Sequence, residues 1–155
     1  MDLQVRNHIY DPSKPLLLMA DTSALESSMV IFQWDQAALD LQITHTKSIL
    51  LTTALRRQSP VHWESFGVKS LLKLARPYLF QSTASVNFLF IDASSFIYIA
   101  RGKPFSSFLQ TLSEEMSMYP SLTVVHLPGR ALWFCDILSR QHDNVIVPRS
   151  DQGQQ

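Results

Sequence analysis

The chain has 155 residues, of which 46% are hydrophobic, and this is enough to build the core of one domain. Its 13 basic residues balance its 13 acidic residues, which excludes a strongly basic nucleic-acid-binding module. The single cysteine, Cys135, excludes an internal disulfide and a cysteine-cluster zinc site, and the 4 glycines cannot form a phosphate-binding glycine loop. The apolar runs are too short to span a bilayer and the N-terminus does not resemble a signal peptide, so we expect a soluble, intracellular protein.

The first part of the chain has the patterns of three consecutive strands. An apolar run at residues 15–21 ends in Asp21, which is typical of a central strand whose end reaches a functional site. A second β-type run covers residues 29–34, and residues 39–46 alternate apolar and polar side chains with period two. We therefore expect three neighbouring strands at the start of the domain.

A helix is expected to follow these strands. Ser59 can cap a helix and Pro60 suits its first position, since proline has no N–H to donate there. Apolar residues then recur at helical spacing to about Arg76, and Pro77 is expected to end the helix.

The second half of the chain continues with strands and helices in alternation. The expected elements are a strand that leads to Asp92, an amphipathic helix stopped by Pro120, a fifth strand and a closing helix, at residues 84–91, 104–119, 122–127 and 131–141. The order βββαβαβα predicts an α/β domain with a five-stranded mixed sheet flanked by helices. We expect this domain over residues 14–141, after a lead-in at 1–13 and before a tail or linker at 142–155.

Several motifs resemble one family. The segment Leu127–Arg140, LPGRALWFCDILSR, resembles the "PG..N..ADaLSR" ending of the ribonuclease H domain in reverse transcriptases of gypsy-type LTR retrotransposons. Earlier in the chain, Met19–Ser23 resembles the family's "TDAS" strand end, Gln33 falls at its "L.Q", and Phe90–Asp92 resembles the "TD" of its "TDH". Glu64 stands where the family has its helix glutamate. The resemblance implies the ribonuclease H fold and hydrolysis of the RNA strand of RNA/DNA hybrids.

The resemblance also implies four carboxylate ligands for two Mg²⁺ ions, with Mn²⁺ as a substitute. Asp21 would bridge both ions, Glu64 and Asp92 would complete the shell of one ion, and Asp136 would hold the other. Oxygen ligands suit Mg²⁺, and two ions about 3.5–4 Å apart can activate a water and stabilise the leaving oxygen of an in-line displacement. We therefore expect these four side chains to converge.

Each of these acids has an ordinary structural explanation as well. Asp92 could be a helix N-cap, Glu64 could favour the positive end of a helix dipole, and Asp21 could form an Asx turn. Asp136 could pair with Arg140 one helical turn later. However, only 13 of 155 residues are acidic, and the coincidence of four of them with the family positions favours the metal site.

The chain departs from the family pattern at four positions. Two family glycines are replaced by Glu26 and Ser28, the histidine of "TDH" is Ala93, and the asparagine of "PG..N" is Leu132. These changes leave the four carboxylates in place but remove polar groups near them. The alternative hypothesis is a catalytically weak or inactive module that serves as a structural or interaction domain of a polyprotein or a domesticated protein.

The same resemblance implies the partners. Ser23 and Arg130 are candidate substrate contacts, and an upstream reverse transcriptase polymerase module is the expected protein partner, in the cytoplasm or a virus-like particle. Since the chain has no net surplus of basic residues, we expect the isolated domain to grip the hybrid weakly and the polymerase module to supply most of the affinity. Five cations could follow a phosphate backbone or form a solvated face: Arg56, Arg57, Lys69, Lys73 and Arg76.

Overall fold

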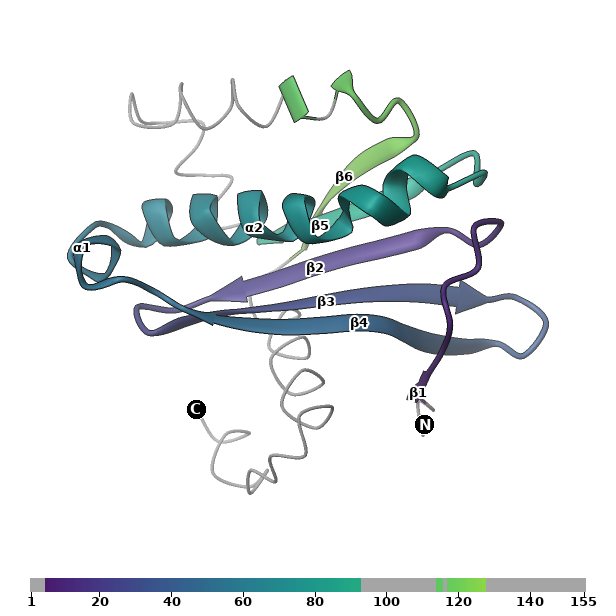
Figure 1. Cartoon of the computed structure of the whole chain (residues 1–155), viewed down its shortest axis with the longest axis horizontal. Helices are drawn as coiled ribbons and strands as arrows, with labels where there is room; N and C mark the ends of the chain where they lie inside the picture. The colour runs from purple at the N-terminus through teal and green to yellow at the C-terminus, as the bar shows by residue number, and fades with distance from the viewer. Residues whose placement is uncertain (1–4, 93–113, 116, 128–155) are drawn as a thin grey trace.

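The computed structural model describes residues 5–92, 114–115 and 117–127 (Figure 1). The described part contains six strands, namely β1 (Val5–Asn7), β2 (Leu16–Thr22), β3 (Glu26–Asp35), β4 (Asp40–Leu50), β5 (Asn87–Asp92) and β6 (Leu122–Leu127). It also contains two helices, α1 (Thr53–Arg56) and α2 (Pro60–Gln81). Residues 114, 115 and 117 are helical and fall within the helix expected at 104–119. Most of that expected helix lies outside the described residues, as does the closing helix expected at 131–141.

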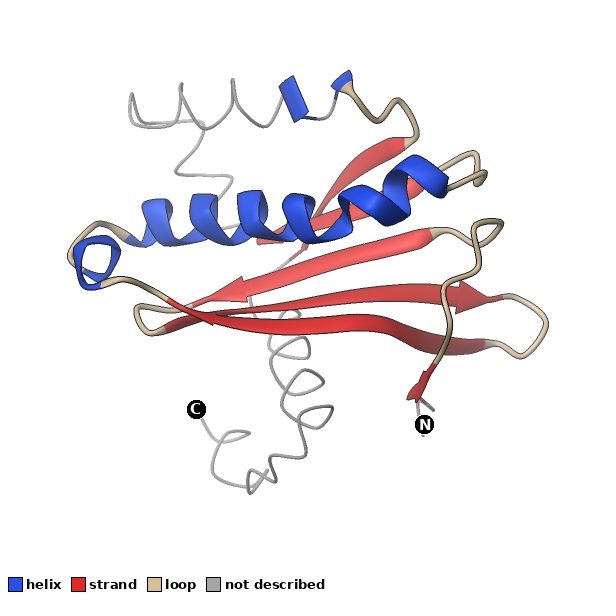
Figure 2. Ribbon diagram, viewed as in Figure 1, coloured by secondary structure: helices blue, strands red, loops and turns tan. Residues whose placement is uncertain are grey.

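The strands form one mixed sheet in the order β1-β4-β3-β2-β5-β6 (Figure 2). β2, β3 and β4 are antiparallel neighbours, whereas β5 runs parallel to β2 and β6 runs parallel to β5. This arrangement confirms the five-stranded mixed sheet expected from the sequence. The three-residue strand β1 was not expected, and it pairs in parallel with β4 from within the predicted lead-in.

Helix α2 covers one face of the sheet and encloses the main core. The side chains of β2 alternate between the two faces of the sheet. Leu16, Leu18 and Ala20 are buried in the core that α2 covers. Leu17 and Met19 pack on the other face. The helix contributes the apolar residues Val68, Leu71, Leu72, Ala75 and Leu79 to this core. No helix among the described residues is long and apolar enough to cross a membrane.

The expected end of the long helix at Pro77 was wrong. Helix α2 begins as predicted, with Ser59 at the N-cap position and Pro60 in the first turn, but it continues past Pro77 to Gln81. The Ser59 hydroxyl makes no capping hydrogen bond to the backbone and lies 2.7 Å from the Nδ1 atom of His62. An interior proline removes one helical hydrogen bond and costs about 3 kcal/mol. Contacts of the following turn offset this cost, because Leu79 is buried in the core and the Tyr10 hydroxyl donates a hydrogen bond of 2.6 Å to the Tyr78 carbonyl.

A β-bulge interrupts the regular alternation of β4. Phe32 of β3 pairs with Ile43 and Ile31 pairs with His45, so that Thr44 is an extra residue. Before the bulge, Ile43 packs on the face away from α2; beyond it, Ile49 packs into the α2-side core. The period-two pattern at 39–46 predicted the strand but not this change of face.

Candidate metal centre

Two of the predicted ligands lie near the C-terminal ends of neighbouring parallel strands. β2 and β5 pair Leu17 with Phe88 and Met19 with Phe90. Continued by two residues at the same offset, this register brings Asp21, the penultimate residue of β2, level with Asp92, the last residue of β5. Parallel strands that end together place their last residues at the same C-terminal end of the sheet, which is the usual position of sites in open α/β folds.

The start of helix α2 lies beside the same end of β2. A Cβ atom added to Gly67 would overlap the Oγ1 atom of Thr22 and would lie 3.0 Å from the Oγ atom of Ser27. Only glycine permits an approach this close between a helix and a strand. The start of α2 lies beside the C-terminal end of β2 (Figure 1). Glu64 precedes Gly67 by three residues on this helix, and it therefore stands about one turn nearer the helix start.

Asp21 and Glu64 approach this end of the sheet from different sides. Asp21 alternates with the buried Ala20 and Thr22, so its side chain is on the face away from α2, where Leu17 and Met19 also pack. Both carboxylates are on residues of intermediate exposure. The close contact of Gly67 with Thr22 brings the helix near the end of β2, where both residues are located.

The replacement at position 28 lies next to Asp21. The antiparallel register pairs Asp21 directly with Ser28, and the two side chains therefore share a face of the sheet. Ser28 is buried, with 1% of its surface exposed. Where the family has a glycine, this chain places a buried hydroxyl beside the predicted bridging carboxylate.

Ser23, a predicted substrate contact, shapes the turn between β2 and β3. Its backbone N–H donates to the Glu26 carbonyl at 2.9 Å, and its hydroxyl oxygen accepts from the backbone N–H groups of Leu25 at 3.2 Å and Glu26 at 3.3 Å. The side chain is exposed at the tip of this turn. These bonds give Ser23 a structural role that the sequence pattern did not indicate.

The described residues contain part of the predicted ligand set. Asp136, Arg130, Ala93 and Leu132 lie outside the described residues, and of Asp92 only the strand position is described. Within the described part of the chain, no three His, Cys, Asp or Glu side chains form a group that could hold a metal ion. The donors at the end of β2 and at the start of α2 are carboxylate oxygens, the type that Mg²⁺ prefers.

Gly67 and Thr22 are residues that the sequence analysis missed. They set the distance between the start of α2 and the end of β2, and hence the position of Glu64. The available signal was a lone glycine inside a helical pattern, which costs the helix about 1 kcal/mol relative to alanine and therefore indicates a packing reason.

Comparison with known proteins identifies the fold. No family model and no curated protein matches this sequence. Among solved structures, LC11-RNase H1 in complex with an RNA/DNA hybrid matches with a TM-score of 0.55 and 9% identity, over 79% of this chain and 91% of that chain. LC11-RNase H1 isolated from compost by a metagenomic approach matches with a TM-score of 0.53 and 12% identity, over 83% of this chain and 93% of that chain.

A viral enzyme shows the same similarity over part of its length. The foamy viral protease-reverse transcriptase in complex with dsDNA matches with a TM-score of 0.54 and 11% identity, over 77% of this chain and 25% of that chain. The strand order of the described sheet and these matches agree, and the chain therefore has a ribonuclease H-like fold.

Proposed function

We propose that this chain is the ribonuclease H domain of a gypsy-type retroelement reverse transcriptase and that it hydrolyses the RNA strand of RNA/DNA hybrids. The observation that carries the proposal is that Asp21 and Asp92 stand at the C-terminal ends of the neighbouring parallel strands β2 and β5, on the side where α2 starts. The fold is shared with LC11-RNase H1, whose structure contains an RNA/DNA hybrid.

In this proposal, four carboxylates hold the metal ions. Asp21 and Asp92 serve from the strand ends, Glu64 serves from the first turns of α2, and Asp136 completes the set from the segment that resembles the family's ending. Two bound Mg²⁺ ions would supply the activation of a water and the stabilisation of the leaving oxygen. The protein contributes the fixed spacing between β2 and α2 that Gly67 permits.

The proposal includes an upstream polymerase module. Net charge is zero, and the acids at the strand ends add negative charge where a phosphate must approach, a sign that bound metal ions would reverse. The polymerase module supplies most of the binding affinity for the hybrid. Hybrid affinity at fixed salt for this chain alone and for this chain joined to its polymerase module tests this, and equal affinities would contradict it.

A second candidate is a weak or inactive ribonuclease H-like module that has a structural or interaction role. Ser28 favours it, because a buried hydroxyl directly opposite Asp21 replaces a family glycine and changes the surroundings of the predicted bridging ligand. The approach of Asp21 and Glu64 from different sides of the sheet makes the geometry sensitive to such a change.

Hydrolysis of an RNA/DNA hybrid labelled on its RNA strand separates the two candidates. The full chain is incubated with the hybrid in Mg²⁺, in Mn²⁺ and in chelator, with an RNA duplex of the same sequence as a substrate control. We expect cleavage of the hybrid alone and only with a divalent ion. No cleavage in either metal, by a chain whose circular dichroism shows the folded domain, would favour the inactive module.

Variants of the carboxylates then test which of these side chains are required for hydrolysis. Asp92→Asn keeps the side-chain volume and removes the charge that would hold a divalent ion, so turnover should fall by more than about 100-fold, the upper end of what losing an outer partner of a metal ligand costs. Glu64→Gln should do the same. The matched control is Glu114→Gln, an exposed acid distant in sequence from the proposed site, which should retain full turnover.

A further inference from the structure

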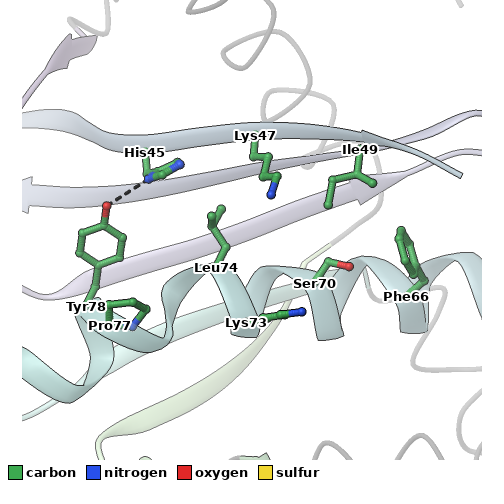
Figure 3. A pocket seen from close by; sticks show the side chains of 9 residues that line it. All are labelled: His45, Lys47, Ile49, Phe66, Ser70, Lys73, Leu74, Pro77 and Tyr78. Carbon is green, nitrogen blue, oxygen red and sulfur yellow. Dashed lines mark hydrogen bonds between the residues drawn. The ribbon is translucent and has the colours of Figure 1, made fainter.

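A groove separate from the strand ends runs between β4 and helix α2 (Figure 3). Its volume is about 620 Å³. Its walls are formed by His45, Lys47 and Ile49 of β4 and by Phe66, Ser70, Lys73, Leu74, Pro77 and Tyr78 of α2. The bulge at Thr44 is the reason that alternate residues of β4 beyond it face this groove.

The charged groups of the groove have one sign. Lys47 stands on the β4 wall and Lys73 on the α2 wall, and both are exposed (Figure 3). Of the described residues, none that lines the groove carries a carboxylate, and neither lysine lies in an ion pair with another described residue, unlike Lys14 with Asp35 or Arg76 with Glu115. Apolar side chains flank the lysines on both walls, so the groove suits an occupant with a negative group between apolar groups.

One end of the groove is closed by a hydrogen bond. The Nδ1 atom of His45 and the hydroxyl of Tyr78 are 3.0 Å apart, and Tyr78 is held in turn by an edge-on contact with the ring of Tyr10, at 4.9 Å between centroids. The shape of this end is therefore fixed by packing from three segments of the chain.

The wall formed by β4 is at the edge of the described sheet. In the described part of the chain, β1 pairs with residues 41–43, and the His8 N–H then donates to the Ile43 carbonyl at 2.8 Å. Among the described residues, positions 46–50 of β4 pair with β3 alone. An edge of this kind accepts an extended segment as a further strand, and the side chains of such a segment alternate with the same period of two as Lys47 and Ile49.

We propose that β4 and this groove bind an extended acidic peptide segment of a partner protein as an added strand. The bound segment carries apolar, acidic and apolar side chains at every second position. The acidic side chain lies between Lys47 and Lys73, and the two apolar side chains contact the walls near Ile49 and Leu74. The site does not depend on the metal centre, so it serves an active or an inactive domain equally.

A synthetic peptide tests the proposal. The probe is Thr-Val-Thr-Glu-Thr-Val-Thr, titrated into the isotope-labelled full chain while backbone amide NMR signals are followed. We expect the largest shifts in residues 46–50 and in the α2 residues that line the groove. A peptide with Lys in place of Glu should bind about threefold to tenfold more weakly, the effect of exchanging attraction for repulsion at partly exposed charges. Of two peptides with proline in place of Val at the second position or Thr at the third, one should lose binding, because neighbouring residues of a strand point their N–H groups to opposite sides and one of the two faces β4.

Charge reversal in the protein provides the matched test. The double variant Lys47→Glu and Lys73→Glu should prefer the Lys peptide, whereas Lys69→Glu, on the same helix but outside the groove lining, should keep the wild-type preference. Equal binding of the two peptides by the wild-type chain would overturn the proposal. So would tighter binding of single-stranded oligouridylate with shifts at the same residues, because the groove would then be a nucleic-acid site.

Discussion

Substituting Gly67 by alanine should loosen the contact that places the start of α2 against β2. In an exposed helix interior this change stabilises by about 0.8–1 kcal/mol, because alanine is the better helix former. Here the new Cβ overlaps Thr22 Oγ1 and crowds Ser27 Oγ, both on buried residues, and overpacking of this kind costs about 1–3 kcal/mol. We therefore expect Gly67→Ala to lower the free energy of unfolding by about 1 kcal/mol.

A double-mutant cycle isolates the steric contact. Thr22→Ala alone removes the 2.8 Å hydrogen bond between the Thr22 and Ser27 hydroxyls and should cost about 1 kcal/mol. In the double variant the alanine at position 67 occupies the space left by the Thr22 side chain, so the two losses should not add. We expect a favourable coupling of at least about 1 kcal/mol.

Urea unfolding followed by circular dichroism measures all four members of the cycle. Two results together would refute the close helix–strand contact. In the first, Gly67→Ala is at least as stable as the wild-type chain. In the second, Gly67→Ala changes the free energy of unfolding by the same amount in the wild-type chain and in the Thr22→Ala variant. Hydrolysis assays of the same variants should show a larger effect on turnover than on stability, because a shift of α2 displaces Glu64 relative to Asp21.

Three further changes test the fold around the site. Leu39 has a φ of 51°, so Leu39→Asn should raise the free energy of unfolding by ~0.5–1 kcal/mol in urea titrations, and no gain would contradict strain there. Tyr10→Phe removes the hydroxyl bonded to the Tyr78 carbonyl and should cost about 1 kcal/mol in the same assay, whereas an unchanged midpoint would contradict that bond's contribution. The Ala38 N–H, and then Lys14, lower the pKa of Asp35 below its ordinary value. Asp35→Asn should therefore be less stable than wild type at pH 7, and the difference should vanish as the pH falls through that lowered pKa; a difference independent of pH would contradict it.

Much of the sheet could be predicted because its strands carry simple patterns. The apolar run before Asp21 and the strand at 122–127 were placed within one residue of β2 and β6. The short strand β1 was missed, since three residues carry no periodic signal and its pairing partner in β4 lies far along the chain. The helix end at Pro77 was wrong because tertiary contacts of Tyr78 and Leu79 outweigh a local rule.

The candidate site was predicted from motifs rather than from packing. The motifs pointed to Asp21 and Asp92, and the parallel register of β2 and β5 is a long-range feature that no local pattern contains. The role of Gly67 depends on its contact with Thr22, which lies 45 positions earlier in the chain. The partner of Gly67 could therefore not be predicted from either segment alone. Ser23 was matched to a motif, but its hydrogen bonds serve the turn itself.

The most direct test of a metal centre at the strand ends is a titration of the isotope-labelled full chain with Mn²⁺, which broadens the NMR signals of nearby amides. In the wild-type chain, the signals of residues 19–22, residues 90–92 and the α2 turn at Glu64 should broaden first, and Asp21→Asn should require a much higher Mn²⁺ concentration for the same effect. Broadening that begins elsewhere, or that is unchanged in Asp21→Asn, would contradict a divalent-metal site formed by these carboxylates.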